Sequence, residues 1–91
     1  MSKVTKGQID DLLSQVVVQT KTFDTPTPHV LATAWLDTFQ LGTAISKAVD
    51  PSNFNEELGI EYSTKDALKI AENKLWELEG YHLYKTLKGD K

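Results

Sequence analysis

The residues of this 91-residue chain that could do chemistry are few and scattered. The two histidines, His29 and His82, stand apart from any Ser-His-Asp arrangement, and a lone histidine more often serves packing or lies on the surface. The chain has no cysteine, which excludes a thiol nucleophile, a disulfide and a cysteine metal site. It also lacks a glycine-rich phosphate loop and metal-ligand spacing. We therefore expect a non-enzymatic protein with no catalytic residue, metal or cofactor.

The clearest binding signal is a helix-start corner, Asp-Pro-Ser-Asn, at residues 50–53. A helix N-terminus presents free N–H groups and a partial positive charge, so it can hold an anion. Ser52 and Asn53 would add hydrogen bonds to a phosphate. Three lysines would add charge if the fold brings them there: Lys47, Lys65 and Lys69. The alternative is that Ser52 or Asn53 caps the helix while the lysines are solvated.

Two aromatic side chains are candidates for stacking on a base. Phe39 falls in an expected turn, where a large ring is unusual, and Trp35 lies near the end of an expected strand. Exposed rings can stack on a ligand or anchor a protein partner. The alternative is that both rings close the core between sheet and helix. All ten cationic side chains are lysine, so the chain cannot bind a phosphate or carboxylate through the bidentate hydrogen bonds of an arginine.

Composition excludes several classes of function. Thirteen carboxylates outnumber ten lysines, and the net charge of -3 argues against a DNA or RNA partner. No apolar run approaches the length of a membrane span, and the N-terminus lacks the apolar stretch of a secretory signal. We expect a small soluble domain without a membrane partner.

Hydrophobic periodicity predicts an α+β fold. A short helix is expected over 5–14, with Thr5 as its cap, followed by strands over 16–23, 29–36 and 41–49. These strands should form an antiparallel meander with the second in the centre and a turn at 37–40. A long helix over 54–87 should pack on the sheet, and small residues such as Gly42 and Ala44 favour a close contact by a helix or a second subunit.

The organisation of the chain leaves one question open. Gly59 and Gly80 could each break the long helix, so one helix and two helices are both compatible with the pattern. We expect a single domain over 1–91, frayed at 1–4 and 88–91. So small a domain buries little surface and has no metal or disulfide to reinforce it, which favours a homo-oligomer.

Two separated motifs resemble a known family. Residues 50–59 read Asp-Pro-Ser-Asn-Phe-Asn-Glu-Glu-Leu-Gly, and Tyr62 and Asp-Ala-Leu at 66–68 follow. Residues 74–81 then read Lys-Leu-Trp-Glu-Leu-Glu-Gly-Tyr. In this order they resemble the small tailed-phage protein family of the phage N-four and S-f-six type, over roughly residues 28–84.

The resemblance implies a function in the host cytoplasm. The family is similar to phage anti-defence sponges, which capture the nucleotide signals of Thoeris and CBASS immunity without cleaving them. It implies a homo-oligomer that holds a cyclic ADP-ribose-like molecule or a cyclic oligonucleotide in pockets at subunit contacts. Trp35 or Phe39 would stack the base, and Lys47, Asn53 and Lys69 would hold phosphate or ribose. Thr64 and Lys69 stand where relatives often carry arginine, which is a departure from the family pattern.

Two other hypotheses compete with the sponge. One is a host-protein inhibitor that presents an acidic helix face, made by Glu56, Glu57, Glu61, Glu72, Glu77 and Glu79. The other is a small hydrolase that acts on the same signals, which would release a product where a sponge returns intact ligand.

Overall fold

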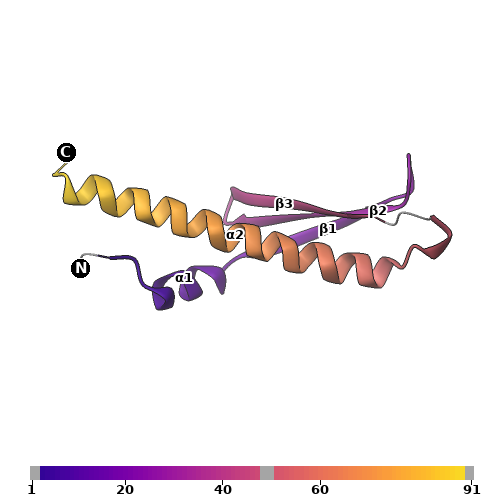
Figure 1. Ribbon diagram of the computed structural model, residues 1–91, viewed down its shortest axis with the longest axis horizontal. Coiled ribbons are helices and arrows are strands. Elements are labelled where there is room, and N and C mark those ends of the chain that lie inside the picture. The colour runs from indigo at the N-terminus through magenta and orange to yellow at the C-terminus, as the bar shows by residue number, and fades with distance from the viewer. Residues whose placement is uncertain (1–2, 48–50, 90–91) are drawn as a thin grey trace.

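The computed structural model describes residues 3–47 and 51–89 (Figure 1). Two helices, three strands and a short 3-10 turn follow one another along the chain. They are α1 (Lys6–Leu13), β1 (Val17–Phe23), β2 (His29–Leu36), β3 (Phe39–Lys47), η1 (Pro51–Asn53) and α2 (Glu56–Leu87). The predicted α+β fold, with a long helix packed on an antiparallel sheet, is confirmed.

The sheet has the predicted order β1-β2-β3, and both pairs are antiparallel. The central strand β2 is rich in β-branched and apolar residues, as its two-sided contacts require. At one end of β2, His29 pairs with Phe23 and Lys47. At the other end, Trp35 pairs with Val17 and Gln40. The last two residues of the predicted third strand, 48 and 49, lie outside the described residues.

The β2–β3 turn is tighter than predicted. It consists of Asp37 and Thr38, and Asp37 adopts a φ of 59°, the left-handed conformation that Asp tolerates in such turns. Phe39 is therefore the first residue of β3, and its predicted place in a turn is wrong. A register shift between Ala34 and Trp35 follows, and Leu41 is only 3% exposed. The bulge turns Leu41 inward, against the simple alternation expected along this strand.

The core lies between one face of the sheet and α2. Alternate β2 residues, Val30, Ala32 and Ala34, are fully buried. They meet a stripe on α2 with a spacing of four residues: Gly59, Ser63, Ala67, Ala71 and Leu75. The small residues of this stripe let α2 approach the sheet closely. At Gly42 of β3 the contact is so close that an added Cβ would collide with Ile70 of α2. A close contact by a helix or a second subunit was predicted for this face of β3, and the structure places helix α2 there.

Helix α2 is continuous from Glu56 to Leu87, so neither Gly59 nor Gly80 breaks it. Its N-cap is Asn55, whose side chain accepts a hydrogen bond of 3.1 Å from the Leu58 N–H. Caps at Ser52 or Asn53 are thus wrong, because those residues belong to η1. Ser63 is buried within α2, and its hydroxyl donates to the Gly59 carbonyl oxygen at 2.7 Å.

Helix α1 begins as predicted, with the Thr5 hydroxyl accepting from the Gln8 N–H at 3.2 Å. The Gln8 side chain does not complete a capping box. It donates instead to Glu79 of α2 at 2.8 Å, which ties the two helices together. On the solvent side, a hydrogen bond to Asp10 raises the pKa of Lys6.

The molecule is elongated, measuring 56 × 22 × 21 Å. Figure 1 shows why: α2 is longer than the sheet it covers, and its C-terminal part runs past the strands beside α1. In the described part of the chain, neither helix combines the length and the apolar character needed to cross a bilayer.

Candidate ligand-binding site at the start of helix α2

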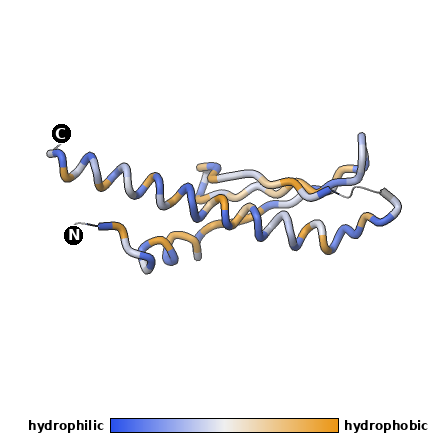
Figure 2. The backbone as a smooth tube through the Cα atoms, viewed as in Figure 1, coloured by the Kyte–Doolittle hydropathy of each residue, from blue (hydrophilic) through white to orange (hydrophobic). Residues whose placement is uncertain are grey.

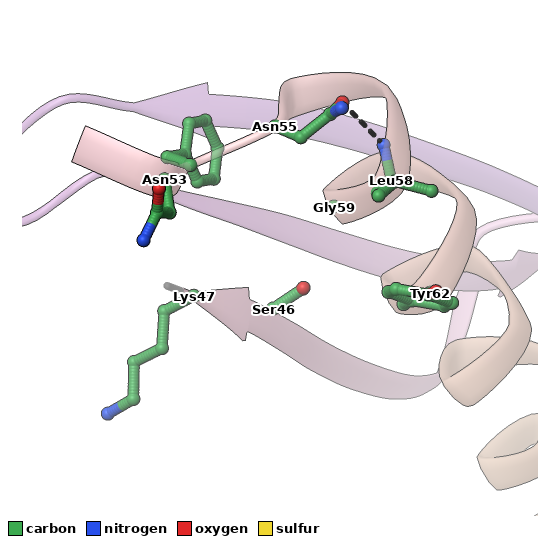
Figure 3. Close-up of a pocket in the computed structure, with 8 residues that line it drawn as sticks. Ser46, Lys47, Asn53, Asn55, Leu58, Gly59 and Tyr62 are labelled. Carbon is green, nitrogen blue, oxygen red and sulfur yellow. Dashed lines mark hydrogen bonds between the residues drawn. The ribbon is translucent and has the colours of Figure 1, made fainter. Parts of the chain in front are cut away.

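A cavity of about 160 Å³ opens where β3 ends and α2 begins (Figure 3). The strand contributes Ser46 and Lys47. The remaining lining residues come from the end of η1, the two residues that link it to α2, and the first two turns of α2: Asn53, Phe54, Asn55, Leu58, Gly59 and Tyr62. The cavity therefore lies between the end of β3 and the start of α2. Turn η1 and residues 48–50 separate these two segments along the chain, and residues 48–50 lie outside the part that the structure describes.

Local structure explains how these side chains are brought together. Leu58 and Tyr62 follow Asn55 by three and seven residues, so the three side chains lie along one side of the helix. Between them, Gly59 is buried, and a Cβ there would lie 3.6 Å from the Phe54 ring and 2.9 Å from Val30. The absence of a side chain at Gly59 thus lets the Phe54 ring and the sheet approach the first turn of α2.

The walls of the cavity combine rings with polar groups. Phe54 is half-buried, while Tyr62 is 51% exposed and presents its ring toward solvent. Ser46 and Asn53 add a hydroxyl and an amide, and the cap bond from Leu58 to Asn55 is drawn in Figure 3. Rings beside hydrogen-bonding groups are suited to a planar heterocycle with polar edges.

Electrostatics at this end of α2 are mixed. Lys47 supplies a positive charge, and Figure 3 shows its side chain extending away from the helix. Glu56 and Glu57 occupy the first turn and are exposed, so their carboxylates already satisfy the partial positive charge of the helix N-terminus. An anion held here would depend on Lys47 more than on the helix dipole.

The seven predicted site residues do not form one site. Lys47 and Asn53 line the cavity, and Ser52 precedes Asn53 in η1. Lys65 and Lys69 line a separate open groove of about 550 Å³, together with Leu13, Ser14, Leu68 and Glu72. This groove follows the contact between α1 and the middle of α2. Its leucine walls and the carboxylate of Glu72 make it less suited to a phosphate than two lysines alone suggest.

The two predicted stacking residues lie at the far end of the sheet. Trp35 pairs near the β2–β3 turn, whereas Lys47 pairs with His29 at the opposite end of β2, on the order of 20 Å away. The Trp35 ring is half-buried, and its Nε1–H donates to the Thr33 hydroxyl at 2.9 Å. Phe39 is 55% exposed. Neither ring reaches the cavity that Lys47 lines.

Sequence reasoning missed the rings that do line the cavity, Phe54 and Tyr62. Both belong to the quoted family motif, so a signal was available. Once Asn55 is recognised as the cap, the spacing predicts that Leu58 and Tyr62 lie on the same side of α2 as the Asn55 side chain. Among the residues that the structure describes, no group of three or more His, Asp or Glu side chains could hold a metal ion.

Residues 4–87 match the phage protein (N4 Gp49/phage Sf6 gene 66) family, and the chain belongs to that family. The family resemblance expected from the two motifs is thereby confirmed, and it extends over the N-terminal helix as well. No curated protein and no solved structure matches the chain.

Proposed function

We propose that this phage protein acts by binding, and that it sequesters a nucleotide-type immune signal at the start of α2. The observation that carries the proposal is the cavity itself, where Phe54 and Tyr62 lie beside Asn53 and Lys47. The rings provide stacking surfaces for a base, the amide provides hydrogen bonds, and the ammonium group provides charge for a phosphate. The ligand is a cyclic ADP-ribose-like molecule or a cyclic oligonucleotide.

The size of the cavity limits how much of the ligand it encloses. Pockets that enclose a whole drug-sized ligand usually measure about 300–1,000 Å³. At about 160 Å³, this cavity takes one ring, and the remainder of a nucleotide lies outside it. Lys47 stands on that outer side, which suits a phosphate attached to a base held between Phe54 and Tyr62. The stacking role thus passes from Trp35 and Phe39 to these two residues.

A thermal-shift titration tests the proposal. Purified protein is mixed with cyclic ADP-ribose-like molecules and with cyclic oligonucleotides, and the unfolding midpoint is followed. A ligand present at 100 times its dissociation constant adds about 2.7 kcal/mol of stability. We expect such a shift with one member of the panel. The ligand should be recovered intact after denaturation, because a binding protein leaves it unchanged.

Matched variants locate the site. Tyr62→Ala should weaken ligand binding by about fivefold to 150-fold, since loss of one base–aromatic stack costs about 1–3 kcal/mol. Phe39→Ala is the control, because Phe39 is similarly exposed (55% against 51%) but lies at the far end of the sheet. No shift with any nucleotide, or equal losses from both variants, would contradict the proposal.

A pull-down with the same purified protein tests the alternative that it inhibits a host protein. Two of the six carboxylates of the predicted acidic face have partners within the chain, because Glu79 accepts a hydrogen bond from Gln8 and Glu77 pairs with Lys74 at 3.6 Å. A stoichiometric host protein captured by tagged wild type would favour the inhibitor. Recovery of a cleaved nucleotide would favour the hydrolase.

A further inference from the structure

The C-terminal part of α2 carries an apolar stripe that the protomer covers only in part, because Leu83 is half-buried and lines a small cavity together with Val4 and Gln8. Beyond Leu75, no residue from Trp76 to Gly89 is buried. Trp76, Gly80, Leu83 and Leu87 are spaced by four, three and four residues, so they share one side of the helix. Trp76 is 37% exposed and Leu87 is 63% exposed. Figure 2 shows apolar residues continuing along α2 after the sheet has ended.

Gly80 is unexplained within a single copy of the chain. A glycine in a helix interior is destabilising relative to alanine, so it usually has a local reason. Gly42 and Gly59 have one, because a Cβ at either position would press on Ile70 or Val30. At Gly80 a Cβ would meet no described atom within 4 Å. The result is a gap in the stripe, between Trp76 and Leu83, that can accept a side chain from outside.

The exposed surface of the protomer is too large for a compact monomer of this mass. Its accessible surface is 6520 Å², whereas a folded monomer of 10.2 kDa is expected to expose about 5,300 Å². The radius of gyration, 16.6 Å, likewise exceeds the value of about 12 Å expected for a compact chain of this length. The excess of roughly 1,200 Å² covers what each partner contributes to a standard interface, about 800 Å².

We propose that this stripe is the contact surface of a homodimer in which the two α2 helices run antiparallel. A two-fold axis between residues 81 and 82 places Trp76 of one copy against Leu87 of the other. The same axis places Leu83 of each copy in the gap above Gly80 of the other. This is the layering of antiparallel coiled coils, in which large and small residues face each other across the seam.

The parallel alternative is disfavoured by the same residues. A parallel pair would set Gly80 against Gly80, which leaves a void, and Trp76 against Trp76, which is crowded.

Sedimentation equilibrium without any nucleotide tests the dimer independently of the ligand proposal. We expect wild type to have twice the mass of the 10.2 kDa chain. Leu87→Glu should raise the dimer dissociation constant by at least about thirtyfold, the effect of losing one interface hot spot. The control is Tyr81→Glu, because Tyr81 is equally exposed (61%) on another side of α2. A monomeric wild type, or equal effects of both variants, would overturn the proposal.

Cysteine cross-linking tests the orientation, and it is clean because the chain has no cysteine of its own. A mixture of Gly80→Cys and Leu83→Cys proteins should form a disulfide-linked heterodimer, since an antiparallel pair brings these positions together. Gly80→Cys alone should cross-link poorly. Efficient cross-linking of Gly80→Cys with itself would show a parallel pair and would overturn the antiparallel arrangement.

Discussion

At the scale of single residues, the two glycines of α2 differ in what a side chain would meet. A Cβ at Gly59 would lie 2.9 Å from Val30, whose branched side chain is fully buried and has little room to move. A Cβ at Gly80 would meet open space. Both glycines suggested a helix break, yet each costs only about 1 kcal/mol relative to alanine. Packing of the Gly59–Leu75 stripe on the sheet supports the helix despite that cost.

Gly59→Ala should therefore lower the free energy of unfolding. Overpacking a filled core costs about 1–3 kcal/mol, which exceeds the gain in helix propensity of about 1 kcal/mol. Gly80→Ala is the matched control and should raise the free energy of unfolding by about 0.5–1 kcal/mol. Urea titration of both variants in the Leu87→Glu background, where dimerisation is weakened, provides the measurement. A stabilising Gly59→Ala would show that the contact with Val30 is looser than the structure indicates.

The candidate site could be predicted from the sequence only in part. Lys47 and Asn53 were identified because they flank the helix-start corner, and the structure places both at the cavity. Lys65 and Lys69 were included on the condition that the fold brings them to the corner, but they line the groove beside α1. The direction of a side chain depends on where the helix starts. The predicted cap at residue 52 or 53 was two or three residues before the true cap, Asn55. The side chains that face the cavity could therefore not be identified from their spacing to the cap.

At the scale of elements, the sequence predicts which helices and strands exist, and in what order, better than it predicts the residues at which they begin and end. The strands over 17–23 and 29–36 were predicted to within one residue, because β-branched runs and the two prolines between them delimit each strand. Phe39 was missed because the left-handed Asp37 permits a turn of two residues, which the residue types alone did not indicate.

Removal of the α2 cap should measure what that element boundary contributes. Asn55→Ala deletes the acceptor for the Leu58 N–H and should lower the free energy of unfolding by about 1 kcal/mol. Asn73→Ala is the control, because Asn73 is exposed in the interior of the same helix, where alanine is favourable. Chemical denaturation with a shared baseline compares the two. An equal change in both variants would mean that Asn55 does not act as the cap.

At the scale of the whole molecule, the elongated shape arises because α2 has 32 residues and the longest strand has nine. A helix of 32 residues spans about 48 Å, whereas a strand of nine spans about 30 Å. Part of α2 must therefore leave the sheet, and only a short α1 lies beside it there. The small size of the chain and its lack of a metal site or disulfide predict a homo-oligomer, and this stays a prediction. The sequence does not indicate the contact surface, because that depends on which apolar residues the fold leaves exposed.

The stability of the molecule should therefore depend on its concentration. If folding and dimerisation are linked, mass action raises the unfolding midpoint of wild type by roughly 3 °C for each tenfold rise in concentration. Leu87→Glu should abolish most of this dependence. Ile45→Glu tests the competing surface, because Ile45 is 58% exposed on the sheet face opposite α2. Calorimetry over a hundredfold range of concentration is the measurement. A dependence that Ile45→Glu removes and Leu87→Glu retains would place the contact on the sheet, and the stripe would then have no role in association.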